Sequence, residues 1–387
     1  MRPHSLNYDH GMVLFSSLVI LALLMALGIG IYFAVQNNHR ISANLRLGSV
    51  AFYLAESGIE WSKDRIRSIP AHPPDPVEGT ENLASGKFSV YTVSTTEISP
   101  LTGGSLVRST GSFGVSSQTV EALITKTYDL SDAAIALRGG AGGVALNGDS
   151  FFVSAMDHDP ATRQVVPGEK ARSPISVADE AARLRIDQGL TDLQRANLVG
   201  QNAGPVGAGD HLPGGDMARL ANDVCSVPSA IIVTIPDDGL LFVGNEAWGN
   251  PSAPQIRCIT GLPSAGDAVA VTGAVTGAGI LVVRDADLAL NGPFHWEGLI
   301  VLSGSNGRFR TSGDPVKEIF GAVLINETTA YSEASPPSLE LQGAVRVFFS
   351  RAALATAARL TPLSTLSALR PGLPSEITQK YWRAMTD

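Results

Sequence analysis

The sequence predicts an α+β protein, with a long N-terminal helix that spans a membrane, then a small antiparallel β-sheet, and finally a β-rich domain. Three observations carry this prediction. Residues 12–35 form an uncharged apolar run, residues 86–124 alternate apolar and polar positions between turn residues, and residues 279–349 repeat short apolar segments behind glycines. The first pattern is typical of a membrane span, the second of antiparallel strands and the third of a coiled stack of parallel strands.

The apolar run extends from Met12 to Val35, about 24 residues. A helix of that length measures about 36 Å, slightly more than the roughly 30 Å hydrocarbon core of a bilayer. A cleaved secretory signal would have a basic n-region and a shorter apolar stretch, whereas only Arg2 is basic ahead of this run. We therefore expect the helix to be retained. Basic residues also follow the run, so charge bias alone does not orient it.

An amphipathic continuation of the same helix is predicted up to residue 69, because apolar residues recur at spacings of three and four. This stripe consists of Ile41, Leu45, Phe52, Ala55, Ile59 and Ile66. Gly28 and Gly30 lie inside the apolar half. Each glycine costs about 1 kcal/mol relative to alanine in a soluble helix, so the pair marks a place where the helix can bend.

The segment from His10 to Trp61 resembles the N-terminal module of PilX-type pilus assembly proteins, a family of minor type IV pilins. The resemblance is carried by an apolar helix that starts directly after a glycine and by the pattern A-x-Y-x-A-E-x-G-I-E, here AFYLAESGIE at residues 51–60. It implies that residues 1–11 are a leader, which a prepilin peptidase removes on the cytoplasmic side by cutting between Gly11 and Met12. Where the family's leaders carry a basic pair before the glycine, this chain has Asp9 and His10.

The fifth position of the implied mature chain is Ser16, where major pilins carry glutamate. That glutamate is thought to neutralise the N-terminal ammonium of a neighbouring subunit, because an unpaired charge in an apolar filament core is costly. Ser16 has no carboxylate for this pairing. Either minor subunits tolerate the loss, or the subunit sits at the filament tip, where no subunit above it needs the pairing.

The resemblance also implies partners and a location. The partners are other pilins, the pilus assembly machinery and the prepilin peptidase. The chain would cross the inner membrane once before assembly, with its C-terminal head outside the cytoplasm, and would reach the pilus or cell surface when assembled. The net charge of −8 and the absence of a basic stripe give no electrostatic support for nucleic-acid binding.

Four prolines in the segment IPAHPPDPVEGTE end the stalk helix over 12–69 and predict a loop. The segments GKFSVYTVSTTEISP, SLVRSTGSFG and QTVEALIT then alternate apolar and polar residues. We expect them to form an antiparallel sheet within residues 70–130 that folds against the stalk helix, as in a pilin headgroup. Its apolar side would comprise Phe88, Val90, Tyr91, Val93, Val107, Phe113, Val115, Val120, Ala122 and Ile124.

Residues 131–363 are predicted to form a β-rich head, followed by a C-terminal tail over 364–387. Short apolar strands follow Gly279, Gly298, Gly321 and Gly343 at intervals of about 19 to 23 residues. Such a step suits one coil of a right-handed parallel β-helix. An α/β sheet built from the same strands is the alternative, but a parallel α/β sheet requires helix-length connections, which these segments lack.

Two further patterns support the coil interpretation. The dipeptides Asn147-Gly148 and Asn291-Gly292 each follow an Ala-Leu pair, and we expect them to be corners with positive φ. Helical periodicity returns only in short segments, at 178–188, 216–224 and 351–359, and we expect the last of these to cap the stack of coils.

The two cysteines, Cys225 and Cys258, both fall in the head. In an oxidising compartment they would form a disulfide across a loop of about 33 residues, worth about 3 to 4 kcal/mol in the chain-entropy model. Two unrelated free thiols are the alternative. Zinc is not expected, because the chain has only two cysteines and no suitably spaced histidines.

The sequence contains no Walker loop, HExxH, GxSxG or dinucleotide motif, and we expect no cofactor. Asp157 and Asp159 flank His158 in a loop that either holds calcium or is a solvated turn. Carboxylates that would be candidates for polysaccharide cleavage, by position only, are Asp285, Asp287, Glu297, Asp314 and Glu318.

Two functions remain open. The chain is either a non-enzymatic minor pilin-like subunit, whose β-rich head mediates adhesion, or a membrane-tethered β-helix enzyme or binder acting on polysaccharide.

Overall fold

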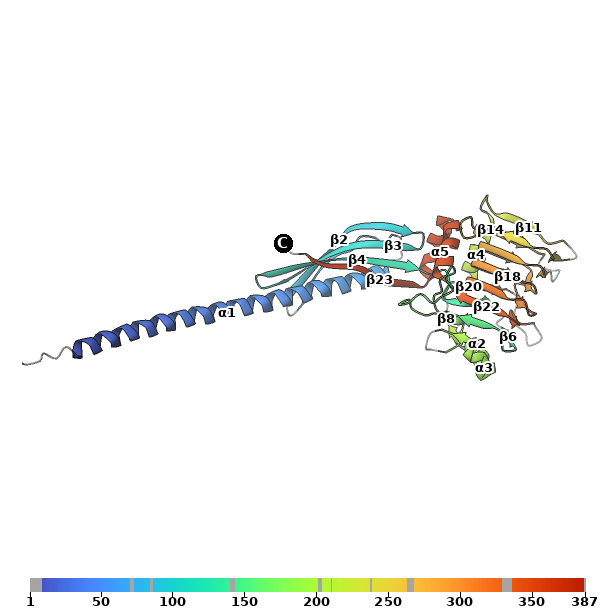
Figure 1. Cartoon of the computed structure of the whole chain (residues 1–387). Coiled ribbons are helices and arrows are strands. Elements are labelled where there is room, and N and C mark those ends of the chain that lie inside the picture. Colours follow the sequence, from blue (N-terminus) through green and yellow to red (C-terminus); the bar gives the residue numbers. More distant parts are fainter. Residues whose placement is uncertain are drawn as a thin grey trace, which may run out of the picture.

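A computed structural model describes residues 9–69, 73–83, 86–139, 143–200, 204–209, 211–236, 239–262, 268–328 and 336–385. Most of the expected leader, residues 1–8, lies outside the described residues. Helix α1 (Asp9–Ser68) is continuous over 60 residues, so Gly28 and Gly30 do not interrupt it. Its N-terminal half projects away from the rest of the molecule (Figure 1).

A five-stranded antiparallel sheet follows the helix, in the order β1-β2-β3-β4-β23. Its strands are β1 (Glu78–Leu83), β2 (Gly86–Ser99), β3 (Thr102–Phe113), β4 (Ser116–Tyr128) and β23 (Ser375–Met385). The edge strand β23 pairs with β4 although the whole head separates them in the chain. Residues 364–387, expected to be a tail, thus contribute a strand to this sheet.

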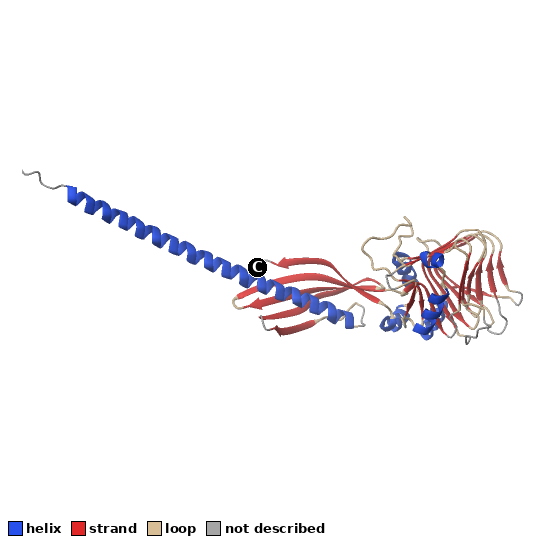
Figure 2. Cartoon of the chain, turned by 90° about the horizontal axis from the view of Figure 1, so that it is seen from below, coloured by secondary structure: helices blue, strands red, loops and turns tan. Residues whose placement is uncertain are grey.

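The second half of α1 packs against the antiparallel sheet (Figure 2). The shared core consists of Ala55, Ile59, Ile66, Val77, Phe88, Val90, Val107, Val120, Ala122 and Ile124. Helix and sheet approach closely at Gly111 of β3, where a Cβ atom would lie 2.0 Å from the carbonyl oxygen of Ala51. Ile41 and Leu45 of the predicted stripe remain exposed, as do Tyr91 and Val93 of β2.

The head is built from two parallel sheets. The large parallel sheet has the order β10-β8-β5-β20-β18-β16-β14-β11, with β13, β22, β7 and β9 paired beside this path, and the small parallel sheet has the order β12-β15-β17-β19-β21-β6. The strands are β5 (Ala133–Gly139), β6 (Val144–Asn147), β7 (Phe152–Ser154), β8 (Ser173–Val177), β9 (Leu198–Val199), β10 (Val206–Ala208), β11 (Ile231–Thr234), β12 (Leu240–Phe242), β13 (Glu246–Trp248), β14 (Gln255–Thr260), β15 (Ala268–Val271), β16 (Val275–Arg284), β17 (Asp287–Leu290), β18 (Phe294–Gly304), β19 (Phe309–Thr311), β20 (Lys317–Glu327), β21 (Leu339–Gln342) and β22 (Val345–Phe349).

From β14 to β22 the chain alternates between the two sheets, and each strand lies parallel beside its equivalent one turn earlier. Gly279, Gly298 and Gly321 lie in register across β16, β18 and β20. Their φ angles of 119°, 145° and 135° favour glycine, and a Cβ on Gly298 would lie 2.0 Å from the Gly279 carbonyl oxygen. The predicted glycine period is therefore a bend repeated in three long strands.

The fourth predicted repeat differs. Gly343 lies in the turn before β22, and β22 pairs with the first half of β20, so that Gly321 faces Phe349. Gly343 has a φ of 79° and approaches the backbone of Gly313 instead. Gly343 therefore lies at a different turn between strands and is out of register with the other three glycines.

The N-terminal strands of the head stack onto its last coil, because β5, β6 and β7 pair with β20, β21 and β22. Both Asn-Gly corners follow strands of the small sheet, β6 and β17. Gly148 has the expected positive φ of 78°, but the expectation for Gly292 was wrong. A Cβ on Gly292 would lie 2.4 Å from the carbonyl oxygens of Thr272 and Gly273, so close backbone approach explains this glycine.

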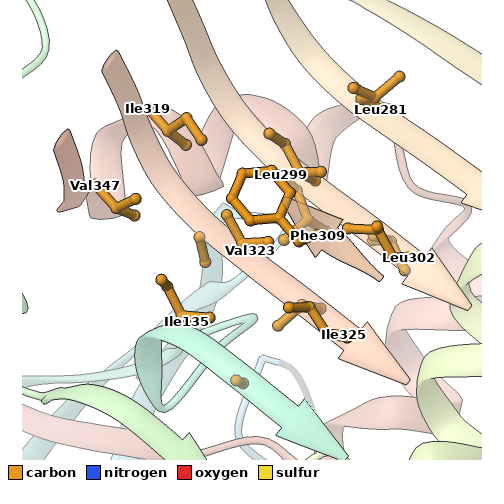
Figure 3. Packing of buried hydrophobic residues seen from close by; sticks show 14 of the residues in the cluster. Ile135, Leu281, Leu299, Leu302, Phe309, Ile319, Val323, Ile325 and Val347 are labelled. Carbon is orange, nitrogen blue, oxygen red and sulfur yellow. The ribbon is translucent and has the colours of Figure 1, made fainter. Parts of the chain in front are cut away.

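The head's core lies between the two parallel sheets, where Leu299, Val323 and Phe309 meet (Figure 3). The helices are α2 (Glu180–Gly189), α3 (Asp192–Ala196), α4 (Gly214–Cys225), α5 (Arg351–Leu360) and α6 (Leu363–Leu369), with a 3-10 turn at Arg370–Gly372. Three of them match the predicted short helices. Helix α5, however, packs across β16, β18 and β20 and so covers a sheet face, which corrects the expectation that it caps the stack.

Candidate functional site

The apolar half of α1 is exposed. Its most apolar 18-residue window has a mean hydropathy of 2.7 and no buried part. Soluble proteins rarely expose contiguous apolar surface of this size, so the segment requires a bilayer or other apolar helices around it. By length and composition, this is a helix that can cross a membrane.

Three residues singled out in the sequence lie in the first turns of this helix. Gly11 and Met12 are both helical, and the Met12 side chain is 77% exposed. The Ser16 hydroxyl donates to the carbonyl oxygens of Met12, at 2.9 Å, and Val13, at 3.1 Å. Its hydroxyl proton is thus donated within its own helix, and Ser16 offers no charge to a neighbouring subunit.

The AFYLAESGIE pattern divides between two sides of α1. Its small residues Ala51, Ala55 and Gly58 face the sheet, and a Cβ on Gly58 would lie 2.1 Å from the Ser109 hydroxyl oxygen. At the margin between α1 and the edge strand β23, a groove of about 320 Å³ is lined by Tyr53, Glu56, Ser57, Ile59, Glu60, Gln379 and Trp382. The pattern therefore provides both the helix–sheet contact and one wall of a surface groove.

A buried ionic network joins the antiparallel sheet to the head. Asp129, just after β4, accepts hydrogen bonds from the guanidinium groups of Arg172 and Arg351, the latter at 3.1 Å. Arg351 Nη2 also donates to Glu376 of β23 at 2.6 Å. Burial raises the pKa of Asp129, while the two arginines act in the opposite direction. The chain passes between the antiparallel sheet and the head twice, after β4 and before β23. These hydrogen bonds therefore hold the two connecting segments together.

Apolar contacts reinforce this junction. Leu101, in the β2–β3 turn, and Tyr128, at the end of β4, both belong to the head's core. The Arg370 guanidinium donates to the Pro100 carbonyl oxygen at 3.2 Å. Two apolar residues of the antiparallel sheet therefore pack into the head's core where the two parts meet.

The loop considered either for calcium binding or as a solvated turn is largely buried, so it is not a solvated turn. Asp157 and His158 are 7% and 6% exposed, and Asp157 Oδ1 accepts a hydrogen bond from the Arg351 backbone N–H at 2.8 Å. Asp157 therefore stabilises the N-terminus of α5, and burial raises its pKa. Asp159 accepts from the Ala161 backbone N–H at 2.9 Å. Across the described ranges, no group of three potential metal ligands occurs.

Three of the carboxylates considered for polysaccharide cleavage have charged or imidazole partners. Glu318 pairs with Arg163 at 3.1 Å, and Glu297 lies 3.2 Å from His295 Nε2, both on the large sheet. Asp287 pairs with Arg310 at 2.9 Å on the small sheet. The other two are Asp285, which accepts from the Ser305 backbone N–H at 3.1 Å, and Asp314, which is exposed.

Cys225 and Cys258 form a disulfide with a Cα–Cα distance of 5.8 Å. It joins the C-terminal end of α4 to β14, and Cys258 is fully buried. Since α4 leads into β11, the bond fastens the start of the outermost coil to the strand beside it.

Two sets of connecting residues were not predicted from the sequence. Lys126 of β4, whose Nζ donates to the Arg67 carbonyl oxygen at the end of α1, had a detectable signal, because it continues the inward-facing series Val120, Ala122 and Ile124 at a spacing of two. Asp129 and Arg351 had none, because 222 residues separate them and neither lies in a recognisable motif.

Comparison with known proteins agrees with the N-terminal geometry. Residues 10–60 match the family model described as PilX N-terminal. No curated protein matches the sequence. Among solved structures, the competence-associated pilin ComZ from Thermus thermophilus aligns with 88% of this chain and 98% of its own, at 13% identity and a TM-score of 0.28, a value too low to support an argument about fold. The chain is therefore similar to the PilX N-terminal family over residues 10–60, which form the apolar half of α1 and the first part of its sheet-packed half.

Proposed function

We propose that this chain is a minor pilin-like structural subunit that takes part in type IV pilus assembly. The observation that supports this most is the single continuous helix α1, whose first half is apolar and exposed and whose second half is built into the antiparallel sheet. Such a helix can rest in the inner membrane before assembly and pack among other pilins afterwards. The match to the PilX N-terminal model covers the same helix.

The proposed topology is a single pass with the head outside the cytoplasm. The disulfide in the head fits an oxidising compartment. On the cytoplasmic side, prepilin peptidase would cut between Gly11 and Met12. The mature chain would then comprise the stalk helix, the antiparallel sheet completed by β23, and the head over residues 131–363.

We propose further that the head is a right-handed parallel β-helix displayed for adhesion. Strands that alternate between two parallel sheets support the coil arrangement. The rigid junction at Asp129 supports a role in bearing load, since a surface contact made by the head would be transmitted to the stalk.

Placement at the filament tip is proposed from Ser16. Without a carboxylate at this position, the subunit cannot neutralise the ammonium of a neighbour, so it fits best where no subunit above it requires the pairing. Immunogold labelling should therefore mark filament ends, and Ser16→Glu should permit labelling along the shaft. Uniform labelling of wild-type filaments would contradict the tip placement.

Processing and assembly test the proposal directly. Mass spectrometry of the chain from assembled pili should find Met12 at the N-terminus, and a bulky residue at Gly11 should leave the leader attached. Deleting the gene should reduce or alter the pili seen by electron microscopy. Unchanged pili, together with release of reducing sugar from polysaccharide by the protein, would favour the enzyme instead.

A further inference from the structure

The head and the antiparallel sheet meet at a narrow junction. The head lies beyond one end of the sheet (Figure 1), and within the described ranges no helix or strand of the head packs extensively against α1 or the antiparallel sheet. The two connecting segments run side by side, since the Asp129 N–H donates to the Pro374 carbonyl oxygen at 2.9 Å. The orientation of the head on the sheet therefore depends strongly on the side chains at this junction.

Six charged side chains meet there, and we call them the junction cluster: Asp129, Asp157, Glu169, Arg172, Arg351 and Glu376. The Arg351 guanidinium donates to Glu169 and, at 2.6 Å, to Glu376. Its Nε donates to Asp129 at 3.1 Å, and the backbone N–H of Arg351 donates to Asp157 at 2.8 Å. The Arg172 guanidinium is the second donor to Asp129. Four carboxylates thus surround two guanidinium groups.

The charges of the junction cluster are divided unequally between its two sides. The antiparallel sheet contributes only carboxylates, Asp129 after β4 and Glu376 of β23. The head contributes both guanidinium groups together with Asp157 and Glu169. When all groups are ionised, the head side has no net charge to attract the two carboxylates of the sheet. One proton on a head-side carboxylate gives that side a net positive charge and strengthens the attraction across the junction.

Asp157 is the head-side carboxylate best placed to hold that proton. It is 7% exposed, whereas the Glu169 side chain is 31% exposed, and no group of metal ligands among the described residues includes it. Burial raises the pKa of Asp157; Arg351 opposes this shift, while the negative charges of Glu169 and Asp129 add to it. The closed junction therefore holds the proton more tightly than an ordinary aspartate, whose pKa is about 4, and this contribution is lost as the pH rises through the raised pKa.

The other titratable or charged groups nearby have partners outside the junction cluster. His158 Nδ1 lies 2.7 Å from the Met156 carbonyl oxygen. Asp159 accepts a hydrogen bond from a backbone N–H within its own loop. The Arg370 guanidinium donates to the Pro100 carbonyl oxygen at 3.2 Å. The charge balance across the junction is therefore set by the cluster itself.

We propose that the junction cluster is a proton-dependent clamp, which holds the head in one orientation on the antiparallel sheet when Asp157 is protonated and releases it when Asp157 ionises. The ionised carboxylate cancels part of the guanidinium charge and repels Asp129 and Glu169 in a largely buried site. Because few other contacts join the two parts, a weaker cluster leaves the head free to change its orientation. Nothing in this mechanism requires a role in a pilus.

The test measures how far the head moves relative to the sheet in the full chain in detergent micelles. Both native cysteines form the disulfide, so added cysteines can be labelled selectively. Nitroxide labels at Ser94→Cys, exposed on β2, and Thr276→Cys, exposed on β16, report the distance between the two parts by pulsed electron paramagnetic resonance. With the wild-type cluster, the distance distribution should be narrow at about pH 5 and broad at about pH 8, because a buried carboxyl loses its proton between them.

Three substitutions in the labelled chain distinguish the clamp from a general effect of pH. Asp157→Asn carries no charge but keeps an oxygen that accepts from the Arg351 N–H, so its distribution should stay narrow at about pH 8. Glu169→Gln removes the other negative charge of the head side and should also narrow the distribution at about pH 8. Asp159→Asn, in the same loop but outside the junction cluster, is the matched control and should broaden like wild type.

Hydrogen exchange gives a second measurement. The Asp129 amide, which joins the two connecting segments, should exchange more slowly in Asp157→Asn than in wild type at about pH 8, by about tenfold for each unit by which the pKa of Asp157 is raised. A wild-type distance distribution that is equally narrow at both pH values overturns the proposal, as does an Asp157→Asn distribution that broadens like wild type. If Asp157→Asn does not fold, Glu169→Gln decides, and its broadening to the wild-type extent overturns the proposal.

Discussion

Lys126 of β4 closes the C-terminal end of α1, because its Nζ donates to the carbonyl oxygen of Arg67 at 2.8 Å. The same ammonium group also contacts the carbonyl oxygens of Ile66, at 3.2 Å, and Ile69, at 2.6 Å. The last carbonyl groups of a helix have no partners within it, and a positive charge is favourable there. The sheet therefore both packs along the helix and fixes its end.

Replacing Lys126 with methionine should destabilise the contact between helix and sheet. The change preserves much of the apolar stem but removes the ammonium donor from the Arg67 and Ile69 carbonyl oxygens, and from that of Ile66, which still accepts from the Ile69 N–H; we expect a cost of about 1 to 3 kcal/mol. Urea unfolding of the full chain in detergent, followed by the fluorescence of Trp61 in a background where Trp248, Trp296 and Trp382 are replaced by phenylalanine, measures this. Lys87→Met on β2, where the side chain is exposed, is the matched control and should have little effect. Equal unfolding midpoints for the two variants would contradict the capping role.

Two glycines of α1 should respond in opposite directions to alanine. At Gly48 the nearest atom to an added Cβ is the Ser116 hydroxyl oxygen at 3.8 Å, so Gly48→Ala should stabilise the helix by up to about 1 kcal/mol. At Gly58 the added Cβ would lie 2.9 Å from Val90 Cγ2 and closer still to Ser109, so Gly58→Ala should destabilise by about 1 to 3 kcal/mol. Thermal unfolding of both variants tests this, and a stabilising Gly58→Ala would show that the contact is looser than described.

The spacing of apolar residues and glycines along the chain predicted those helices and strands whose formation depends mainly on neighbouring residues. The stalk helix, the alternating strands of the antiparallel sheet and the recurring apolar strands at Gly279, Gly298 and Gly321 follow from residue spacing, although these glycines lie inside strands that were predicted to begin after them. The expectation failed at Gly343, because the same glycine-plus-strand pattern suits two different corners of a coil. Which corner it occupies depends on pairing with β20, which is not a local property.

Pairings between distant segments could not be predicted. Residues 375–385 have no feature that indicates pairing with β4, and the N-terminal strands of the head give no sign that they stack on its last coil. Both arrangements depend on which edge remains available once the rest of the sheet has formed. The function of Asp157 was missed for the same reason, since its hydrogen-bond donor, Arg351, is 194 residues away.

The disulfide between Cys225 and Cys258 should make the head measurably more stable than the same head without it. Purified protein should have no titratable thiol after denaturation and should migrate differently when reduced. Replacing both Cys225 and Cys258 with serine should lower the free energy of unfolding of the head by about 3 to 4 kcal/mol, since a loop of 33 residues is released. Two free thiols in protein taken from the oxidising compartment would contradict the bond.

The buried carboxyl group of Asp287 should make the stability of the head depend on pH. Burial raises the pKa of this carboxyl to about 6, although Arg310 and Arg308 act against the shift. The folded state therefore binds its proton more tightly than the unfolded chain, whose aspartate has a pKa of about 4. A raised pKa favours folding below about pH 4, and this contribution is lost as the pH rises through about 6.

The measurement compares Asp287→Asn with wild type across that window. The asparagine variant does not titrate, so the difference in unfolding free energy should shift in its favour by up to about 3 kcal/mol between pH 4 and pH 7, as roughly two pKa units imply. Chemical unfolding at pH 4, 5, 6 and 7 measures the shift. Asp314→Asn, in the exposed loop before β20, is the matched control and should keep a constant difference from wild type. If the Asp287→Asn difference is equally constant, the arginines offset the cost of burial, and Asp287 is charged in the folded head throughout the range.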